Sequence, residues 1–132
     1  MQIIHKPIEP SDIAFSDKIN SSQKFIDDAL EYAHGTHDFY DIVKTVIAGD
    51  AQFFYADDAA LITEIIDYPK RRTLRFWLAG GNLQTLKKIE LDAIEWSKNW
   101  DCVACEIVGR RGWIKALDGF VEAGTVGVKN YG

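Results

Sequence analysis

Apolar residues recur at helical spacing in the first part of the chain. The pattern turns helical from Asn20, and Ser21 or Ser22 could cap the start of this helix. Gly35 ends the run, and a second, shorter helix follows that Gly49 closes. The apolar positions are Phe25, Ala29, Leu30 and Ala33 in the first helix, and Phe39, Ile42, Val43, Val46 and Ile47 in the second.

From Ala51 the apolar pattern has a period of two, which is typical of β-strands. "AQFFYA" (51–56) and "ALITEII" (60–66) are predicted as strands joined by a hairpin turn at Asp57-Asp58. "YPKR" predicts a second turn, and "TLRFWLA" (73–79) is the next predicted strand. These three strands would form an antiparallel meander.

Helical spacing returns after this meander. Apolar positions from Leu83 to Trp100 predict an amphipathic helix of about four or five turns. The last predicted elements are a buried strand at "CVACEIV" (102–108), a short helix at "GWIKALDGF" (112–120) and a strand at "EAGTVGVKN" (122–130).

A short first strand is predicted at "IIHKPI" (3–8), with Pro7 and Pro10 ending it. The order is therefore strand, two helices, three antiparallel strands, helix, strand, helix, strand. It predicts an α+β fold, with a mostly antiparallel sheet flanked by helices and a crossover helix in its second half. The sequence contains no repeat or linker, so we expect one domain over residues 1–132.

Composition narrows the possible function classes. The chain has 132 residues, 47% of them hydrophobic, which is enough for a proper core. A net charge of -5 argues against a nucleic-acid binder, including one built on the basic turn "PKRRTLR". No apolar run is long enough to cross a membrane, and the N-terminus lacks the pattern of a signal peptide. These features predict a cytoplasmic protein.

The only two cysteines, Cys102 and Cys105, lie in one apolar segment. If this segment is a strand, their side chains point to opposite faces and cannot form a disulfide without distortion. We interpret them as reduced core thiols rather than as a redox C-x-x-C pair.

The order of elements and the sequence of the second half resemble the Gcn5-related N-acetyltransferase (GNAT) superfamily. In that family a fourth strand leads into a glycine-containing loop at the start of a long helix, and a fifth strand splays away from the fourth. The matching segments, in order, are "LRFWLAGG", "NLQTLKKIELDAIEWSKNW", "DCVACEIVG", "RRGWIKALDGF" and "EAGTVGVKN". The resemblance covers about Ala51 to Lys129, and "VGRRGW" is also similar to short GNAT-like proteins of bacteriophages.

The resemblance implies that acetyl-CoA is the cofactor. Loop amides at Asn82, Leu83 and Gln84 would hold its pyrophosphate, with Gly80 and Gly81 letting the backbone approach. From the residues alone, a tight strand-to-helix turn is the commoner explanation for two such glycines. Side-chain charge near the CoA phosphates could come from Lys87, Lys88, Arg110 and Arg111.

Three features depart from the family pattern. The family's loop begins with Arg or Gln three residues before its first glycine, where this chain has Trp77, and its two glycines are spaced rather than adjacent. Many members carry a tyrosine that protonates the departing CoA thiolate, and Lys115 stands at that position. Tyr55 and Tyr131 could replace it, but the sequence singles out neither.

Glu64 is the candidate general base, because GNAT enzymes usually deprotonate the acceptor amine through a carboxylate on a central strand. It interrupts an apolar strand, and burial there would raise its pKa. Asp67, near the end of the same strand, is the second candidate. The alternative is that Glu64 simply faces water on a half-exposed strand.

The segment "HGTHD" carries His34 and His37 near Asp38 and Asp41, but no further ligand cluster supports a metal site, and we expect none. The tryptophans are best explained by core packing, although Trp113 could lie beside the splayed strand.

Two functions remain open at this stage. The first is an N-acetyltransferase that transfers an acetyl group from acetyl-CoA to an amine acceptor, which the sequence does not identify. The second is a non-catalytic GNAT-fold phage protein that binds a host or virion protein, in which case it would act in the host cytoplasm. GNAT dimers commonly meet at the last strand and C-terminus, so a homodimer is in keeping with either function.

Overall fold

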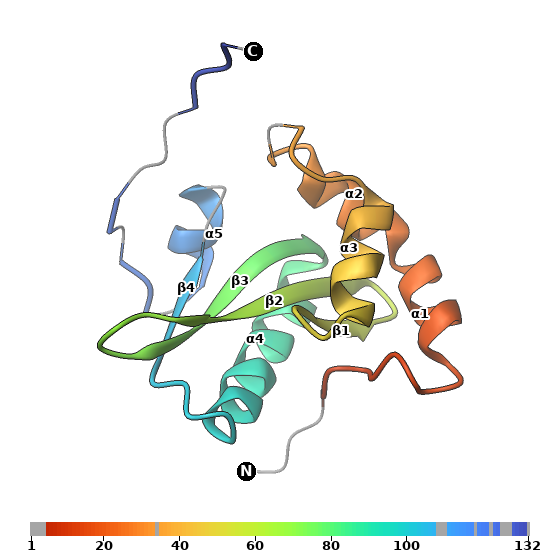
Figure 1. Cartoon of the computed structure of the whole chain (residues 1–132), viewed down its shortest axis with the longest axis horizontal. Coiled ribbons are helices and arrows are strands. Elements are labelled where there is room, and N and C mark those ends of the chain that lie inside the picture. Colours follow the sequence, from red (N-terminus) through yellow and green to blue (C-terminus); the bar gives the residue numbers. More distant parts are fainter. Residues whose placement is uncertain are drawn as a thin grey trace.

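The computed structural model describes residues 5–33, 35–107, 111–117, 119–121, 123–124 and 128–131. A mixed sheet lies between helices in this part of the chain (Figure 1). The elements are, in chain order, α1 (Phe15–Ser21), α2 (Gln23–Leu30), α3 (Phe39–Ile47), β1 (Gln52–Ala56), β2 (Ala59–Asp67), β3 (Arg72–Gly81), α4 (Leu83–Lys98), β4 (Ala104–Ile107) and α5 (Arg111–Ala116).

The strands lie in the order β1-β2-β3-β4. β1 and β2 form an antiparallel hairpin, in which Ala56 pairs with Ala59 across a two-residue turn, and β2 pairs antiparallel with β3. β4 joins the edge of β3 in the parallel direction, because α4 carries the chain back across the sheet. The predicted meander, the hairpin at Asp57-Asp58 and the crossover helix are therefore confirmed.

Helices cover both faces of the sheet, and the alternation of strand residues builds a separate core on each face. Ala60 and Ile62 belong to the first core, beneath α1, α2 and α3, whereas Ala59 and Leu61 belong to the second core, beneath α4 (Figure 1). The first core comprises Phe15, Ile19, Ile26, Ala29, Phe39, Ile42, Val46, Ala51, Phe53, Ala60, Ile62 and Leu78. The second core comprises Phe54, Ala59, Leu61, Leu74, Phe76, Leu86, Ile89, Ala93 and Cys102.

β3 carries one extra residue relative to β2. Ile62 pairs with Leu78 and the following residue, Thr63, pairs with Phe76, so Trp77 has no partner in β2. Such a bulge reverses the alternation of side chains along the strand. Phe76 consequently faces the second core and Leu78 the first, although a regular strand would place both on the same face.

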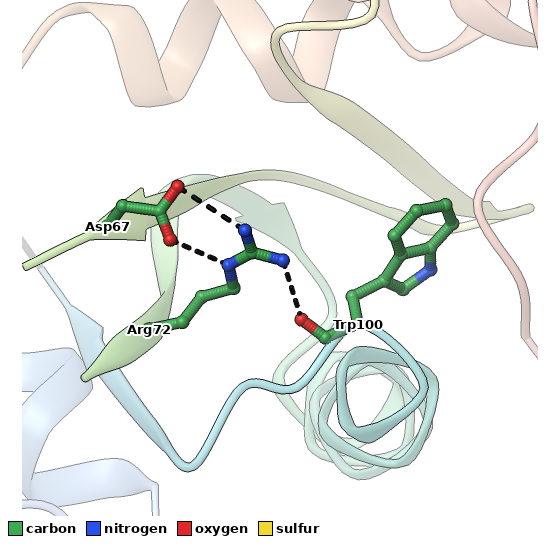
Figure 2. Close-up of polar contacts among 3 residues, drawn as sticks. All are labelled: Asp67, Arg72 and Trp100. Carbon is green, nitrogen blue, oxygen red and sulfur yellow. Dashed lines mark hydrogen bonds and ion pairs between the residues drawn. The ribbon is translucent and has the colours of Figure 1, made fainter.

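Arg72, the first residue of β3, connects the end of β2 to the loop before β4 (Figure 2). Its Nε donates a hydrogen bond of 2.6 Å to Asp67, and Nη1 donates one of 3.0 Å to the carbonyl oxygen of Trp100. The Arg72 carbonyl in turn accepts from the N–H of Val103 at 3.1 Å. These contacts set where β4 begins beside β3.

The prediction of a first strand at 3–8 was wrong for the residues that the structure describes. Residues 5–9 have no regular secondary structure, and residues 1–4 lie outside the described part. Ile8 makes one ladder-like contact, its N–H donating to the carbonyl of Phe53 at 2.9 Å. Pro7 has no N–H to donate, which limits further pairing.

The helix predicted from Asn20 is two helices, and the first begins five residues earlier. Phe15 and Ile19, one turn apart, are buried in the first core, so helical spacing already applies there. Ser22 then separates α1 from α2. The second predicted helix is confirmed as α3.

The predicted last strand is also not found within the described residues. Positions 123, 124 and 128–130 are outside any strand, and the remainder of 122–130 is not described. The predicted strand at 102–108 is confirmed only as the shorter β4. No helix in the described ranges is both long and apolar enough to cross a bilayer.

Candidate functional site

Backbone from neighbouring elements encloses both glycines of the predicted cofactor loop. A Cβ atom on Gly80 would overlap the carbonyl oxygen of Phe25 in α2. One on Gly81 would overlap the carbonyl oxygen of Asp58, and Gly81 also has a φ of 109°, which disfavours any side chain. Close packing of β3 against α2 and the β1–β2 turn therefore accounts for both glycines without a ligand.

The N-terminus of α4 follows the glycine pair directly. Asn82 is its N-cap, and the Asn82 side chain accepts a hydrogen bond from the Thr85 N–H at 3.1 Å. The N–H of Asn82 donates to the Asp58 carbonyl at 2.8 Å. Among the described residues, the N–H groups of Leu83 and Gln84 have no partner. Two of the three amides predicted to hold a phosphate are thus available, and the third is engaged.

A carboxylate shares this helix terminus. The Asp58 side chain accepts from the Thr85 hydroxyl at 3.1 Å, within the first turn of α4. Helix N-termini attract anions because their unpaired N–H groups carry partial positive charge. A phosphate at Leu83 and Gln84 would therefore lie near an existing negative charge, which weakens its binding.

Within the described residues, β4 pairs with only the first part of β3. The paired residues run from Thr73–Ala104 to Phe76–Ile107, whereas β3 continues to Gly81. Beyond Phe76, the edge of β3 that pairs with β4 has no strand partner within the residues described. We call this the half-paired edge. In the described part of the chain it leads to the N-terminus of α4, so strand groups and helix amides without a described partner lie at the same end of β3.

Beside the last β3–β4 pair, three charged side chains form a row across β2, β3 and β4. Arg75 lies between Glu64 and Glu106, its register partners on either side. Its Nη1 is 3.8 Å from Glu64 Oε1, and its Nη2 is 3.7 Å from Glu106 Oε1. The Tyr68 hydroxyl donates to the same Glu106 oxygen at 2.6 Å. We call Glu64, Arg75 and Glu106 the charged row.

Glu64, the predicted base, has a perturbed pKa. Burial raises the pKa of this carboxyl above its usual value, and the positive charges of Arg75 and His37 offset part of that increase. Its side chain remains 25% exposed. A raised pKa makes a carboxylate a stronger proton acceptor, which suits a general base.

Trp77 makes its contacts on the side of the first core. The Trp77 ring packs on the first core and meets the ring of His37 edge-on, with centroids 4.9 Å apart. The residue that stands at the family's Arg or Gln position therefore lies on the same side of the sheet as α2 and α3.

The structure gives the remaining catalytic candidates other surroundings. Asp67 accepts the Arg72 hydrogen bond and is therefore engaged. Tyr55 stacks on Phe53, with 5.8 Å between ring centroids, and Tyr131 is 94% exposed. Lys115 is exposed on α5.

Several predicted residues fall outside the described part. Arg110 is not described. Arg111 begins α5, but its side chain and that of Trp113 are not described. Lys87 is half-buried and Lys88 exposed, both one turn into α4.

The histidine and aspartate segment has a structural role. Asp38 and Asp41 form the capping box of α3, each side chain accepting from the other's N–H at 2.9 Å. The described residues, which exclude His34, contain no group of three or more potential metal ligands.

Both cysteines are free and belong to one side of the sheet, contrary to the expectation of opposite faces. β4 starts at Ala104, so Cys102 precedes the strand, and both thiols contact the second core. Burial raises the pKa of both thiols, that of Cys105 to about 11, which keeps them protonated and unreactive.

Arg75, Glu106 and Tyr68 were missed from the sequence. The available signal was one charged residue inside each of the apolar runs "TLRFW" and "ACEI". Each resembles the ordinary outward residue of a strand, and only the sheet register brings them beside Glu64.

The mixed sheet, the half-paired strands and the helix that starts beside them define the fold of GNAT acetyltransferases. A probable acetyltransferase has a TM-score of 0.69 at 9% identity, and a GNAT family acetyltransferase of Staphylococcus aureus has a TM-score of 0.63 at 17% identity; each match covers 99% of this chain and 100% of the other. A possible acetyltransferase of Clostridium difficile has a TM-score of 0.53 at 12% identity, covering 96% of both chains. At these identities the likeness concerns the fold. No protein-family model and no curated protein matches the sequence.

Proposed function

We propose that the protein is an N-acetyltransferase that uses acetyl-CoA and an amine acceptor in the cytoplasm. One observation carries the proposal: within the described residues, the edge of β3 continues past its last pair with β4 to the Leu83 and Gln84 amides, which have no partner there. An acyl-CoA has an anionic pyrophosphate, an extended arm and a terminal thioester, and this edge offers a complementary part for the first two.

In this proposal the amides of Leu83 and Gln84 bind the pyrophosphate at the start of α4. The pantetheine arm follows the unpaired edge of β3 from Gly81 toward Phe76 and makes strand-like hydrogen bonds there. Arg110 and Arg111, which follow β4 in the chain, add positive charge for the CoA phosphates. The thioester then ends beside the charged row.

The chemistry is a direct transfer within a ternary complex. Glu64 accepts a proton from the acceptor ammonium, directly or through one water, and leaves a neutral amine. The amine nitrogen attacks the thioester carbonyl carbon, so that a C–N bond forms as the C–S bond breaks. The nitrogen then gives its second proton to solvent, and the departing CoA thiolate takes a proton from solvent.

A partner-binding GNAT-fold protein without activity, such as a phage protein directed at a host or virion protein, is the second candidate. The carboxylate of Asp58 at the helix terminus favours it, because that charge opposes phosphate binding. The packing role of Gly80 and Gly81 points the same way, since both glycines are required without any ligand.

The deciding experiment measures acetyl-CoA binding by calorimetry and thermal shift, together with thiol release in the presence of primary amines. We expect acetyl-CoA to raise the melting temperature, because a ligand that binds only the native state stabilises it. We also expect thiol release that depends on an added amine. The absence of both heat and thermal shift at millimolar acetyl-CoA would exclude the enzyme and leave the partner-binding protein.

A further inference from the structure

The charged row is not a closed set of salt bridges. Both N–O distances in it, 3.8 Å and 3.7 Å, exceed those of hydrogen bonds, and the buried Nε of Arg75 has no partner. In the described part of the chain, Glu64 accepts no hydrogen bond, and Glu106 accepts only that of Tyr68. The row therefore keeps unused acceptor capacity on both carboxylates.

The row is also accessible and negatively charged. The side chains of Glu64, Arg75 and Glu106 are 25%, 30% and 31% exposed. Two carboxylates and one guanidinium leave a net charge of -1 when both acids are ionised, so the row attracts cations.

Arg75 separates two positions for positive charge. Glu64 and Glu106 lie on strands two spacings apart, about 10 Å between backbones. A single ammonium cannot contact both carboxylates without also approaching the guanidinium that lies between them. Two ammonium groups on a flexible spacer can each meet one carboxylate and avoid Arg75.

We propose that the acceptor is a small alkyl diamine, a substrate class that rests on the acetyltransferase function proposed above. The amine beside Glu64 is the one that is acetylated. The other remains an ammonium bound to Glu106, whose carboxylate is oriented by the Tyr68 hydroxyl. An α-amino acid fits less well, because its carboxylate would lie at Arg75 between two glutamates.

The test compares 1,4-diaminobutane with butylamine, a monoamine of the same carbon length, by calorimetry on the protein without acetyl-CoA. We expect the diamine to bind at least tenfold more tightly. Glu106→Gln should reduce diamine binding to the level at which the same variant binds butylamine. Gln keeps an oxygen for Tyr68, so the variant should fold. Glu95→Gln makes the same change of charge on α4, outside the charged row. It should change the affinity for neither amine.

Equal binding of the two amines by the wild-type protein overturns the diamine inference, and this comparison needs no variant. Full diamine affinity in Glu106→Gln overturns it as well. The outcome is separable from that of the proposed function. Acetylation of butylamine as efficiently as the diamine contradicts only the acceptor assignment, whereas diamine binding without acetyl-CoA binding contradicts only the acetyltransferase.

Discussion

Gly80 of β3 lies directly against the backbone of Phe25 in α2, with no room for a side chain between them. This contact brings a helix from the first half of the chain onto the strand that leads to the candidate cofactor loop. The glycine that resembles a ligand-binding residue in the sequence is thus a packing residue in the structure.

Gly80→Ala should destabilise the protein by about 1–3 kcal/mol, because its Cβ would overlap the Phe25 carbonyl and force α2 away from β3. Urea denaturation measures the change in the free energy of unfolding. Gly112→Ala on α5 is the control, since a Cβ there meets nothing within 4 Å and alanine favours a helix. Equal effects of the two substitutions would contradict the packing role.

Leu83→Pro should weaken acetyl-CoA binding about tenfold or more at nearly unchanged stability. Proline removes one of the two unpaired N–H groups, and a hydrogen bond to a charged group contributes about 1.5–3 kcal/mol. The first helical position tolerates proline, and Asn82 already has the extended backbone that must precede it. Gln84→Ala changes a side chain at the same terminus but keeps its amide, so its affinity should match the wild type. If Leu83→Pro binds acetyl-CoA with the affinity of the wild type, the pyrophosphate binds elsewhere.

Glu64→Gln should lower kcat about 100-fold or more, because glutamine cannot accept the proton of the acceptor amine. Under the proposed function, kcat/KM of the wild-type protein should rise with pH through the raised pKa of Glu64 and then level off. A variant with undiminished kcat would remove Glu64 from the mechanism.

The same substitution has a signed effect on stability. Since burial raises the Glu64 pKa in the native state, the native protein holds this proton more tightly than the unfolded chain. Ionising Glu64 therefore costs stability as the pH rises from the ordinary glutamate pKa to the raised one. Denaturation curves at pH 4 and pH 7 should show a smaller loss of stability in Glu64→Gln than in the wild type. A larger loss in the variant would contradict the sign of the shift.

Arg72→Lys should destabilise the protein by about 1 kcal/mol although it keeps the charge. An ammonium lacks the planar fork that contacts both Asp67 and the Trp100 carbonyl (Figure 2). Hydrogen exchange should also quicken at Val103, whose N–H is bonded to the Arg72 carbonyl. Arg71→Lys in the exposed turn is the matched control and should stay within about 0.5 kcal/mol. If the Val103 N–H exchanges in Arg72→Lys at the rate of the wild type, another contact holds β4 in place.

The strand meander, α3 and α4 were predictable because their apolar spacing, turns and caps act within a few residues of chain. The same local signals failed at α1, where Phe15 and Ile19 alone mark an early helix, and at the first strand. The structure of these two segments depends on the surface against which each one packs, and not on the spacing of its apolar residues.

The sequence by itself determined the order of most elements and the position of the glycine loop before α4, because both follow from local periodicity and backbone preference. Only the tertiary structure decided what that loop does. The contacts of Gly80 with Phe25 and of Gly81 with Asp58 join residues far apart in the chain. Sheet register likewise placed Arg75 between Glu64 and Glu106, and a single extra residue at Trp77 determined which face of β3 each neighbour occupies. Such pairings depend on how strands align in space, which local spacing does not specify.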